Sequence, residues 1–119
     1  MNYTNFTSEY VKTGCGMNVE FNQIHTHKTG SKCMVEFYGI ENSIYIQFEN
    51  GFTTNVEING SVIKISLEND YRTRDLSTHP SWNTNRKTLV RCYLHHILSN
   101  RAKENVYAIQ DLVSENLNF

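Results

Sequence analysis

Apolar and polar residues alternate with a period of two through the first half of this chain. In "SIYIQFENG", Ile44, Ile46 and Phe48 share one face of an extended segment, and the residues between them take the other face. The same alternation recurs in "KCMVEFYG", "FTTNVEING" and "SVIKISLEN". This pattern is typical of strands that are buried on one face only. With "MNVEFNQIHTH" as the first strand, residues 17–67 are predicted to form four or five strands.

Short segments rich in Gly and Asn separate these predicted strands. They read "TGSK", "GIENS", "ENGF" and "INGS", and they supply the residues that tolerate the positive φ of tight turns. Strands joined by such short turns must run antiparallel, because a parallel crossover takes a dozen residues or more. The first half is therefore predicted to be an antiparallel meander.

The pattern changes after Leu67. Residues 68–85, "ENDYRTRDLSTHPSWNTN", are polar and aperiodic and are predicted to form a long basic loop, a kind of segment that is often functional. In residues 86–117 apolar positions recur at helical spacing and predict two helices. The first would bury Leu89, Cys92/Tyr93 and His96/Ile97, and the second Val106, Ile109 and Leu112/Val113. The predicted fold class is α+β, with the helices covering one face of the meander.

Composition is compatible with one folded domain spanning residues 1–119. Apolar residues make up 39% of the chain and charged residues 19%, which is ordinary for a globular domain. No apolar run is long enough to span a bilayer, and the N-terminus lacks the pattern of a signal peptide. A host-cell cytoplasmic protein with no membrane partner is therefore predicted. Three cysteines, an odd number, do not indicate a disulfide framework.

The charge is distributed unevenly, although the net charge is only −1. Residues 71–103 hold seven cations and one acid, whereas residues 1–70 hold four cations and eight acids. Lys and Arg bind phosphates and acidic surfaces, and aromatic side chains stack on bases or anchor protein contacts. The sequence therefore predicts a binding surface in this segment. Its predicted members are Tyr71, Arg72, Arg74, Trp82, Arg86, Lys87 and Arg91.

A second candidate site lies in "CGMNVEFNQIHTHKTGSKC". Thiolate and imidazole are the ligands that zinc prefers, and a hairpin could bring such groups together. The four candidates are Cys15, His25, His27 and Cys33. Their spacing matches no tight zinc-knuckle pattern, and buried thiols beside ordinary histidines explain the same residues. The main prediction is that the protein has no cofactor, with zinc as the alternative.

A third candidate is "YLHHILSNRAKEN", which resembles the metal-dependent HNH nucleases. The resemblance implies His96 as general base, His95 as a metal ligand and Asn100 or Asn105 as an orienting or ligating amide, with magnesium or a similar ion bound. That family needs its histidine at a strand end, whereas the apolar spacing here indicates a helix that buries His96.

A longer stretch, "HKTGSKCMVEFYGIENSIYIQFENGFTTNVEINGSVIKI", resembles the β-rich modules that accompany HNH homing endonucleases in phages. "SWNTNRKTLVRCY" is similar to a segment that often follows those modules. The modules contact DNA, so the resemblance implies a protein of a phage or mobile element that has kept a binding scaffold and lost the nuclease.

The sequence favours a non-enzymatic function. It has no glycine-rich phosphate loop, no GxSxG and no dinucleotide fingerprint. In general type the chain is similar to the anti-CRISPR inhibitors, a resemblance that carries no residues with it. It implies an inhibitor that docks on a nucleic-acid-processing enzyme through the basic segment. A DNA- or RNA-binding module and an HNH-like nuclease are the alternatives.

Overall fold

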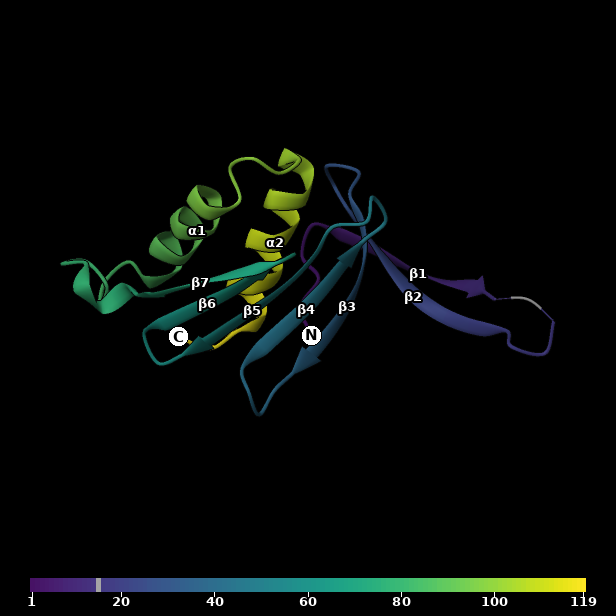
Figure 1. Cartoon of the computed structure of the whole chain (residues 1–119), viewed down its shortest axis with the longest axis horizontal. Helices are drawn as coiled ribbons and strands as arrows, with labels where there is room; N and C mark the ends of the chain where they lie inside the picture. Colours follow the sequence, from purple (N-terminus) through teal and green to yellow (C-terminus); the bar gives the residue numbers. More distant parts are fainter. Residues whose placement is uncertain (15) are drawn as a thin grey trace.

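The computed structural model describes residues 1–14 and 16–119, and it has an α+β architecture. A seven-stranded antiparallel sheet precedes two helices, and the strands lie side by side in chain order (Figure 1). The strands are β1 (Phe6–Thr13), β2 (Glu20–His27), β3 (Lys32–Tyr38), β4 (Ser43–Phe48), β5 (Thr53–Asn59), β6 (Val62–Leu67) and β7 (Asp70–Asp75). A short 3-10 helix, η1 (Leu76–Thr78), leads to α1 (Arg86–Ile97) and α2 (Lys103–Asn116).

The α+β class, the antiparallel meander and the two terminal helices are confirmed, but the predicted number of strands is wrong. The structure has seven strands instead of four or five, because β1 and β7 were not predicted. The predicted first strand also begins at Glu20 and not at residue 17. Both missed strands lie at the edges of the sheet, and all six residues of β7 are exposed. Such strands need no alternation of apolar and polar residues, so the periodicity gives no signal.

The predicted basic loop at residues 68–85 is accordingly shorter than expected. Residues 70–75 pair with β6 along its whole length, and residues 76–78 form η1. The Asp75 side chain caps η1, because its Oδ1 accepts a hydrogen bond from the Ser77 amide at 3.0 Å. The connection without regular structure is therefore limited to residues 79–85.

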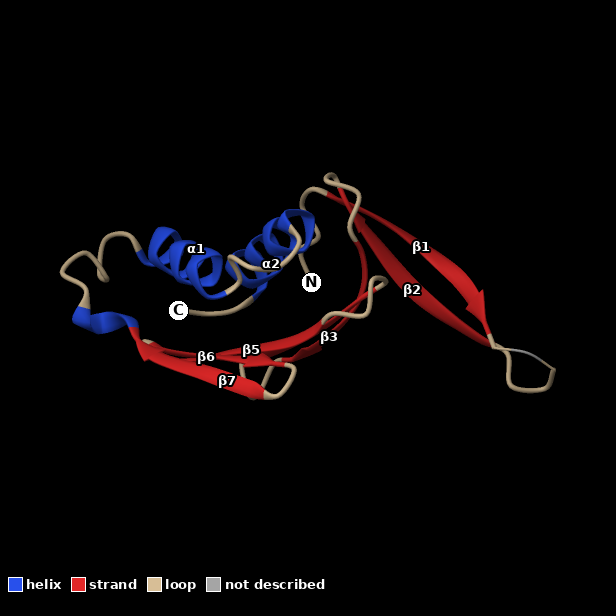
Figure 2. Cartoon of the chain, turned by 45° about the horizontal axis from the view of Figure 1, so that its top comes forward, coloured by secondary structure: helices blue, strands red, loops and turns tan. Residues whose placement is uncertain are grey.

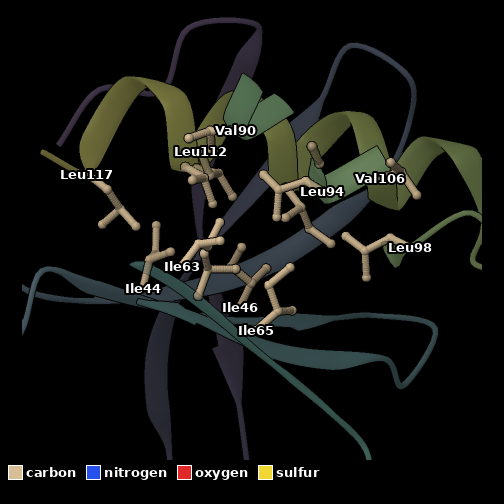
Figure 3. Packing of buried hydrophobic residues seen from close by; sticks show 14 of the residues in the cluster. Ile44, Ile46, Ile63, Ile65, Val90, Leu94, Leu98, Val106, Leu112 and Leu117 are labelled. Carbon is tan, nitrogen blue, oxygen red and sulfur yellow. The ribbon is translucent and has the colours of Figure 1, made fainter. Parts of the chain in front are cut away.

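The core lies between one face of the sheet and the layer formed by the two helices (Figures 2 and 3). Ile44 and Ile46 from β4 and Ile63 and Ile65 from β6 are completely buried there, as their alternation predicts. From the helices, the residues drawn against them include Val90, Leu94, Val106 and Leu112. Burying each side chain of this size stabilises the fold by about 1.5–3 kcal/mol before entropy is counted.

The buried face of α1 differs from the predicted one. Val90 and Leu94 are fully buried, whereas Cys92 and His96 are exposed. Leu89, Tyr93 and Ile97 are only partly buried and flank the core. Two apolar stripes overlap on this helix, and the stripe that contains Val90 and Leu94 packs on the sheet. In α2 the predicted burial of Val106, Ile109, Leu112 and Val113 is confirmed.

The first two strands form a ribbon that leaves the rest of the sheet. β1 and β2 pair over eight positions, but β2 and β3 pair only at His25↔Cys33 and Thr26↔Lys32. Beyond these pairs the ribbon diverges from β3 and projects away from the helices (Figure 1). The molecule is consequently elongated, with principal extents of 55 × 29 × 28 Å. Among the described residues, no helix is both long and apolar enough to cross a bilayer.

Candidate binding surface

The two arginines of β7 lie on the side of the sheet that carries the helices. Arg72 pairs with Ile65 and Arg74 with Ile63 across the β6–β7 ladder. Residues directly opposite each other in an antiparallel pair point to the same face. Ile63 and Ile65 face the helices, so both guanidinium groups leave the edge strand on that side. β7 is the last strand of the sheet, so no further strand in the described residues pairs with it on that side.

Helix α1 contributes to the same side of the molecule through Tyr93 and Arg86. Burial raises the pKa of the Tyr93 hydroxyl, and the positive charges of Arg74 and Arg72 partly offset the increase, which places both arginines near Tyr93. Arg86 lies two helical turns before Tyr93 and therefore on the same flank of α1. We call Arg72, Arg74 and Arg86 the cationic strip.

The members of the cationic strip have few carboxylate partners. Arg72 Nε lies 3.3 Å from Asp70 Oδ2, and both side chains are more than half exposed, so this ion pair contributes little. Within residues 1–14 and 16–119, Arg74 and Arg86 have no ion pair. Arg86 instead donates to Asn83 Oδ1 at 3.2 Å, and its guanidinium lies 4.9 Å from the centre of the Trp82 ring.

Trp82 and Tyr71, two aromatic residues predicted on the binding surface, do not belong to the strip. Trp82 is only 6% exposed and packs in the core, where it anchors the connection before α1. Tyr71 is 62% exposed but is paired with Ser66, so it points to the helix-free face of the sheet. There the Lys64 ammonium lies 5.5 Å from the centre of the Tyr71 ring. The structure therefore does not bring the two predicted rings onto one surface.

Lys87 and Arg91 lie on the flank of α1 that faces α2. Arg91 Nη1 donates hydrogen bonds of 3.0 Å to Asp111 Oδ1 and to Ser114 Oγ. The charges of Arg91 and Lys87 also act on the carboxyl group of Glu115. Arg91 therefore holds the two helices together, and α1 divides the predicted basic surface into two flanks.

Asp111 is the centre of a polar network that the sequence did not predict. Its carboxylate accepts hydrogen bonds from Arg91 Nη1, from His27 Nε2 at 2.7 Å and from Asn5 Nδ2 at 3.2 Å. Burial raises the pKa of Asp111, but these hydrogen bonds outweigh burial and hold the pKa below its usual range. The network joins the N-terminal segment, β2 and both helices. The only sequence signal is an acid within the apolar pattern of α2.

The histidines considered for zinc are engaged in the packing of the ribbon. His25 Nδ1 lies 2.6 Å from Ser8 Oγ, and its ring stacks on Tyr3 with 3.9 Å between centres. Burial lowers the pKa of His25. Cys33 lies opposite His25, and burial raises the pKa of its thiol to about 12, which disfavours the thiolate that zinc binds.

The fourth zinc candidate, Cys15, lies outside the described residues. In the rest of the chain, no three potential metal ligands form a group. Both ring nitrogens of His27 already have hydrogen-bond partners, because they lie within hydrogen-bond distance of Asp111 and of Thr29 Oγ1. Nothing in this geometry indicates a metal centre at His25, His27 and Cys33.

The residues considered for HNH chemistry lie at the end of α1. His95 and His96 are exposed in its last turn, and Asn100 is exposed in the turn that follows. His96 thus occupies a helix and not the strand end that the HNH scaffold requires. Asn105 is buried, and its Oδ1 accepts a hydrogen bond from Ser31 Oγ at 2.6 Å. The arrangement around these residues does not support the resemblance.

Comparison with known proteins relates almost the whole chain to one phage family. Residues 1–118 match the family described as Phage Gp30.7 protein. The chain is 47% identical over 115 residues to an uncharacterized 14.1 kDa protein in the Gp30-rIII intergenic region of Enterobacteria phage T4. The match covers 95% of each of the two proteins. No solved structure matches the chain.

Proposed function

We propose that this chain, which belongs to the phage Gp30.7 protein family, is a non-enzymatic binding protein of the infected cell's cytoplasm. It docks through the cationic strip onto an acidic surface of a nucleic-acid-processing protein and inhibits that protein by covering it. The observation that carries the proposal is the outward position of Arg72, Arg74 and Arg86 on an uncovered sheet edge and the neighbouring flank of α1.

The electrostatics of the strip suit an acidic protein surface. Among the residues that the structure describes, Asp70 is the one acid with an ion pair to the strip, and the pair is exposed and weak. Complementary charge of this kind accelerates encounter and fixes orientation more than it adds affinity. Tyr93, which is partly buried beside the arginines, supplies an aromatic surface at the centre of the contact.

Several features favour a protein partner over direct binding of DNA or RNA. Single-stranded nucleic acid is usually held by aromatic side chains that stack on bases, as well as by cations. Here Trp82 is buried and Tyr71 lies on the other face of the sheet. The three guanidinium groups of the strip would neutralise only about three phosphates, which gives weak binding at physiological salt. The net charge of −1 does not add a long-range attraction.

The edge of β7 also favours contact through side chains. Four of its six residues are charged, with Asp70 and Asp75 at its two ends. Charged residues at an open edge disfavour the addition of another strand. The partner is therefore expected to contact the guanidinium groups and not to extend the sheet at β7.

Two measurements distinguish a protein partner from nucleic acid. The immobilised protein is incubated with host lysate, with and without nuclease treatment, and binding to a fluorescent DNA duplex is followed by anisotropy at increasing salt. We expect a discrete protein to be captured equally after nuclease treatment. Duplex binding should be weak and should fall with a log–log slope of about −3. Capture that disappears with nuclease, or tight duplex binding at physiological salt, would contradict the proposal.

A further inference from the structure

The divergence of β2 from β3 leaves two strand edges without partners. β3 continues to Tyr38, but its last pair with β2 is at Cys33, so within the described part of the chain Met34–Tyr38 have no paired strand on that side. The facing edge of β2, Glu20–Ile24, is equally unpaired. Figure 1 shows β2 and β3 diverging beyond the two pairs that join them, His25↔Cys33 and Thr26↔Lys32. We call the space between them the edge cleft.

The edge cleft contains a real cavity where the strands separate. Its volume is about 530 Å³, and its lining includes Val11 and Ile24 from the ribbon and Met34 from β3. Glu9, Lys32 and Glu49 lie at the same cavity, and Gln47 and Phe48 of β4 also line it. An apolar lining with a few charged groups beside it matches the usual composition of a specific binding site.

The edge of β3 lacks the protection that the other end of the sheet has. β7 carries charges at four of its six positions, whereas Met34–Tyr38 contain only Glu36. Phe37 and Tyr38 are 38% and 45% exposed, and Ile40 in the next turn is fully exposed. Natural sheets normally block an open edge with charges, bulges or covering segments. An edge that is apolar and uncovered indicates a place where another strand is added.

The ribbon itself points to the same conclusion. A two-stranded hairpin is marginally stable alone in water. In this ribbon Tyr10 is 72% and Phe21 is 68% exposed, although both are large and apolar. A strand inserted into the edge cleft would pair with both open edges and cover Phe21.

The two faces of the edge cleft differ in chemistry. On the helix side, Phe21 of β2 and Val35 and Phe37 of β3 face the inserted strand, because they share the face of His25 and Cys33. On the helix-free side, Glu20 and Glu36 face it, together with the apolar Ile24 and Met34. An inserted strand therefore needs apolar residues on the helix side, and on the other side apolar residues with cations opposite the two acids.

The charges around the edge cleft select a basic occupant. The acids on the ribbon, on β3 and on the adjoining turns outnumber the cations by five to three. The acids are Glu9, Glu20, Glu36, Glu41 and Glu49, and the cations are Lys12, Lys28 and Lys32. In the described ranges, none of these eight side chains forms an ion pair.

We propose that the edge cleft binds an extended segment of a partner protein, as an added strand in which Lys or Arg alternates with apolar residues. Main-chain hydrogen bonds to Met34–Tyr38 provide affinity, and the alternating side chains provide specificity. A second copy of this chain fits less well. Its open edges at β1 and β2 carry the same acids, and its β7 alternates arginine with Tyr71 and Thr73 between two aspartates.

The test uses two short capped peptides, one alternating valine with lysine and the other alternating valine with glutamate. Amide hydrogen exchange of the intact protein is measured with each peptide. The lysine peptide should slow exchange in Met34–Tyr38 and Glu20–Ile24, and the glutamate peptide should not. Glu36→Lys should weaken binding of the lysine peptide about fivefold, because one exposed attraction becomes a repulsion. Glu104→Lys, the same exchange on α2, should leave binding unchanged.

Unchanged amide exchange with the lysine peptide, or equal slowing by both peptides, would overturn the proposal. A dimer whose Met34–Tyr38 amides are already protected would also overturn it, because the occupant would then be a second copy. The cationic strip lies at the opposite edge of the sheet, so reversing its charges should leave peptide binding intact. Failure of this proposal is thus distinct from failure of the proposed function.

Discussion

At the scale of single residues, the polar contacts of Asp111 connect more of the fold than any other side-chain group described above. Its carboxylate receives hydrogen bonds from Asn5, His27 and Arg91, which belong to three separate parts of the chain. The Asp111 side chain is only 10% exposed, and that of His27 is fully buried. Removing the carboxylate would leave buried donors without an acceptor.

We therefore predict that Asp111→Ala lowers the free energy of unfolding by about 2–3 kcal/mol, the cost of unsatisfied buried donors. Urea denaturation followed by circular dichroism measures this change. Asp70→Ala is the control, because it breaks an exposed ion pair with Arg72 and should cost less than about 1 kcal/mol. Equal losses in the two variants would show that the Asp111 network does not stabilise the fold.

For Glu115, in contrast to Asp111, we expect that removing the carboxylate stabilises the fold. Burial raises the pKa of its carboxyl, and the charge of Asp111 raises it further. The hydrogen bond with the Thr4 backbone and the charges of Arg91 and Lys87 lower this pKa, but by less. Glu115 Oε2 is also buried without a hydrogen-bond partner. The pKa of this carboxyl is therefore higher in the folded state than in the unfolded state, where it is about 4.3. The free energy of unfolding consequently falls as the pH rises from this unfolded-state pKa through the folded-state pKa.

Glu115→Gln should remove this loss, because the amide has no charge to bury. The variant should be more stable than the natural protein at pH 7, and the two should differ less at pH 4. Thermal unfolding at the two pH values checks the prediction. A variant that is less stable at pH 7 would mean that the Glu115 carboxylate is stabilised by contacts with Arg91 and Lys87.

Residue-level burial was only partly predictable from the sequence. Ile44, Ile46, Ile63 and Ile65 alternate with polar residues, and they are buried as predicted. Trp82 stands in a polar segment without any period, so nothing local indicated that its ring enters the core. Packing against residues distant in the sequence decides the position of Trp82. One predicted contact residue therefore lies in the core and not on the candidate surface.

At the scale of elements, the predictable strands are the ones that bury a face. β4, β5 and β6 lie under the helices, and their alternating pattern specified both their existence and their orientation. β1 and β7 lie at the edges and are held by main-chain pairing with one neighbour, which leaves no hydrophobic signature. The position of Arg72 and Arg74 on one face could not be predicted, because it follows from the register of β7.

The difference between the sheet's centre and its ribbon should appear in amide hydrogen exchange. Ile44 and Ile46 in β4 lie under the helices between two paired strands. Tyr10 and Phe21 lie on the ribbon, where the residues are mostly exposed. Amides of β4 should exchange only through global unfolding, whereas amides of the outer ribbon should exchange through local opening and orders of magnitude faster. Similar rates would show that the ribbon is packed more firmly than its exposure implies.

At the scale of the whole molecule, the sheet separates two surfaces of opposite charge. The cationic strip lies at the β7 edge and on α1, and the acid-rich edge cleft lies where the ribbon leaves β3. The sequence showed the charge asymmetry between its segments, but folding divided the basic segment. Arg91 and Arg101 pair with Asp111 and Glu68, so only part of the predicted surface faces outward.

The central claim is that Arg72, Arg74 and Arg86 are used by a partner outside the molecule. The most direct test is capture from nuclease-treated host lysate by the triple variant Arg72→Glu, Arg74→Glu, Arg86→Glu. Lys28→Glu, Lys64→Glu, Lys103→Glu is the matched control, with the same change in net charge at other surfaces. The triple variant should remain folded and lose capture of the partner by about tenfold or more, while the control retains it. Equal capture by the triple variant and the natural protein would contradict the claim.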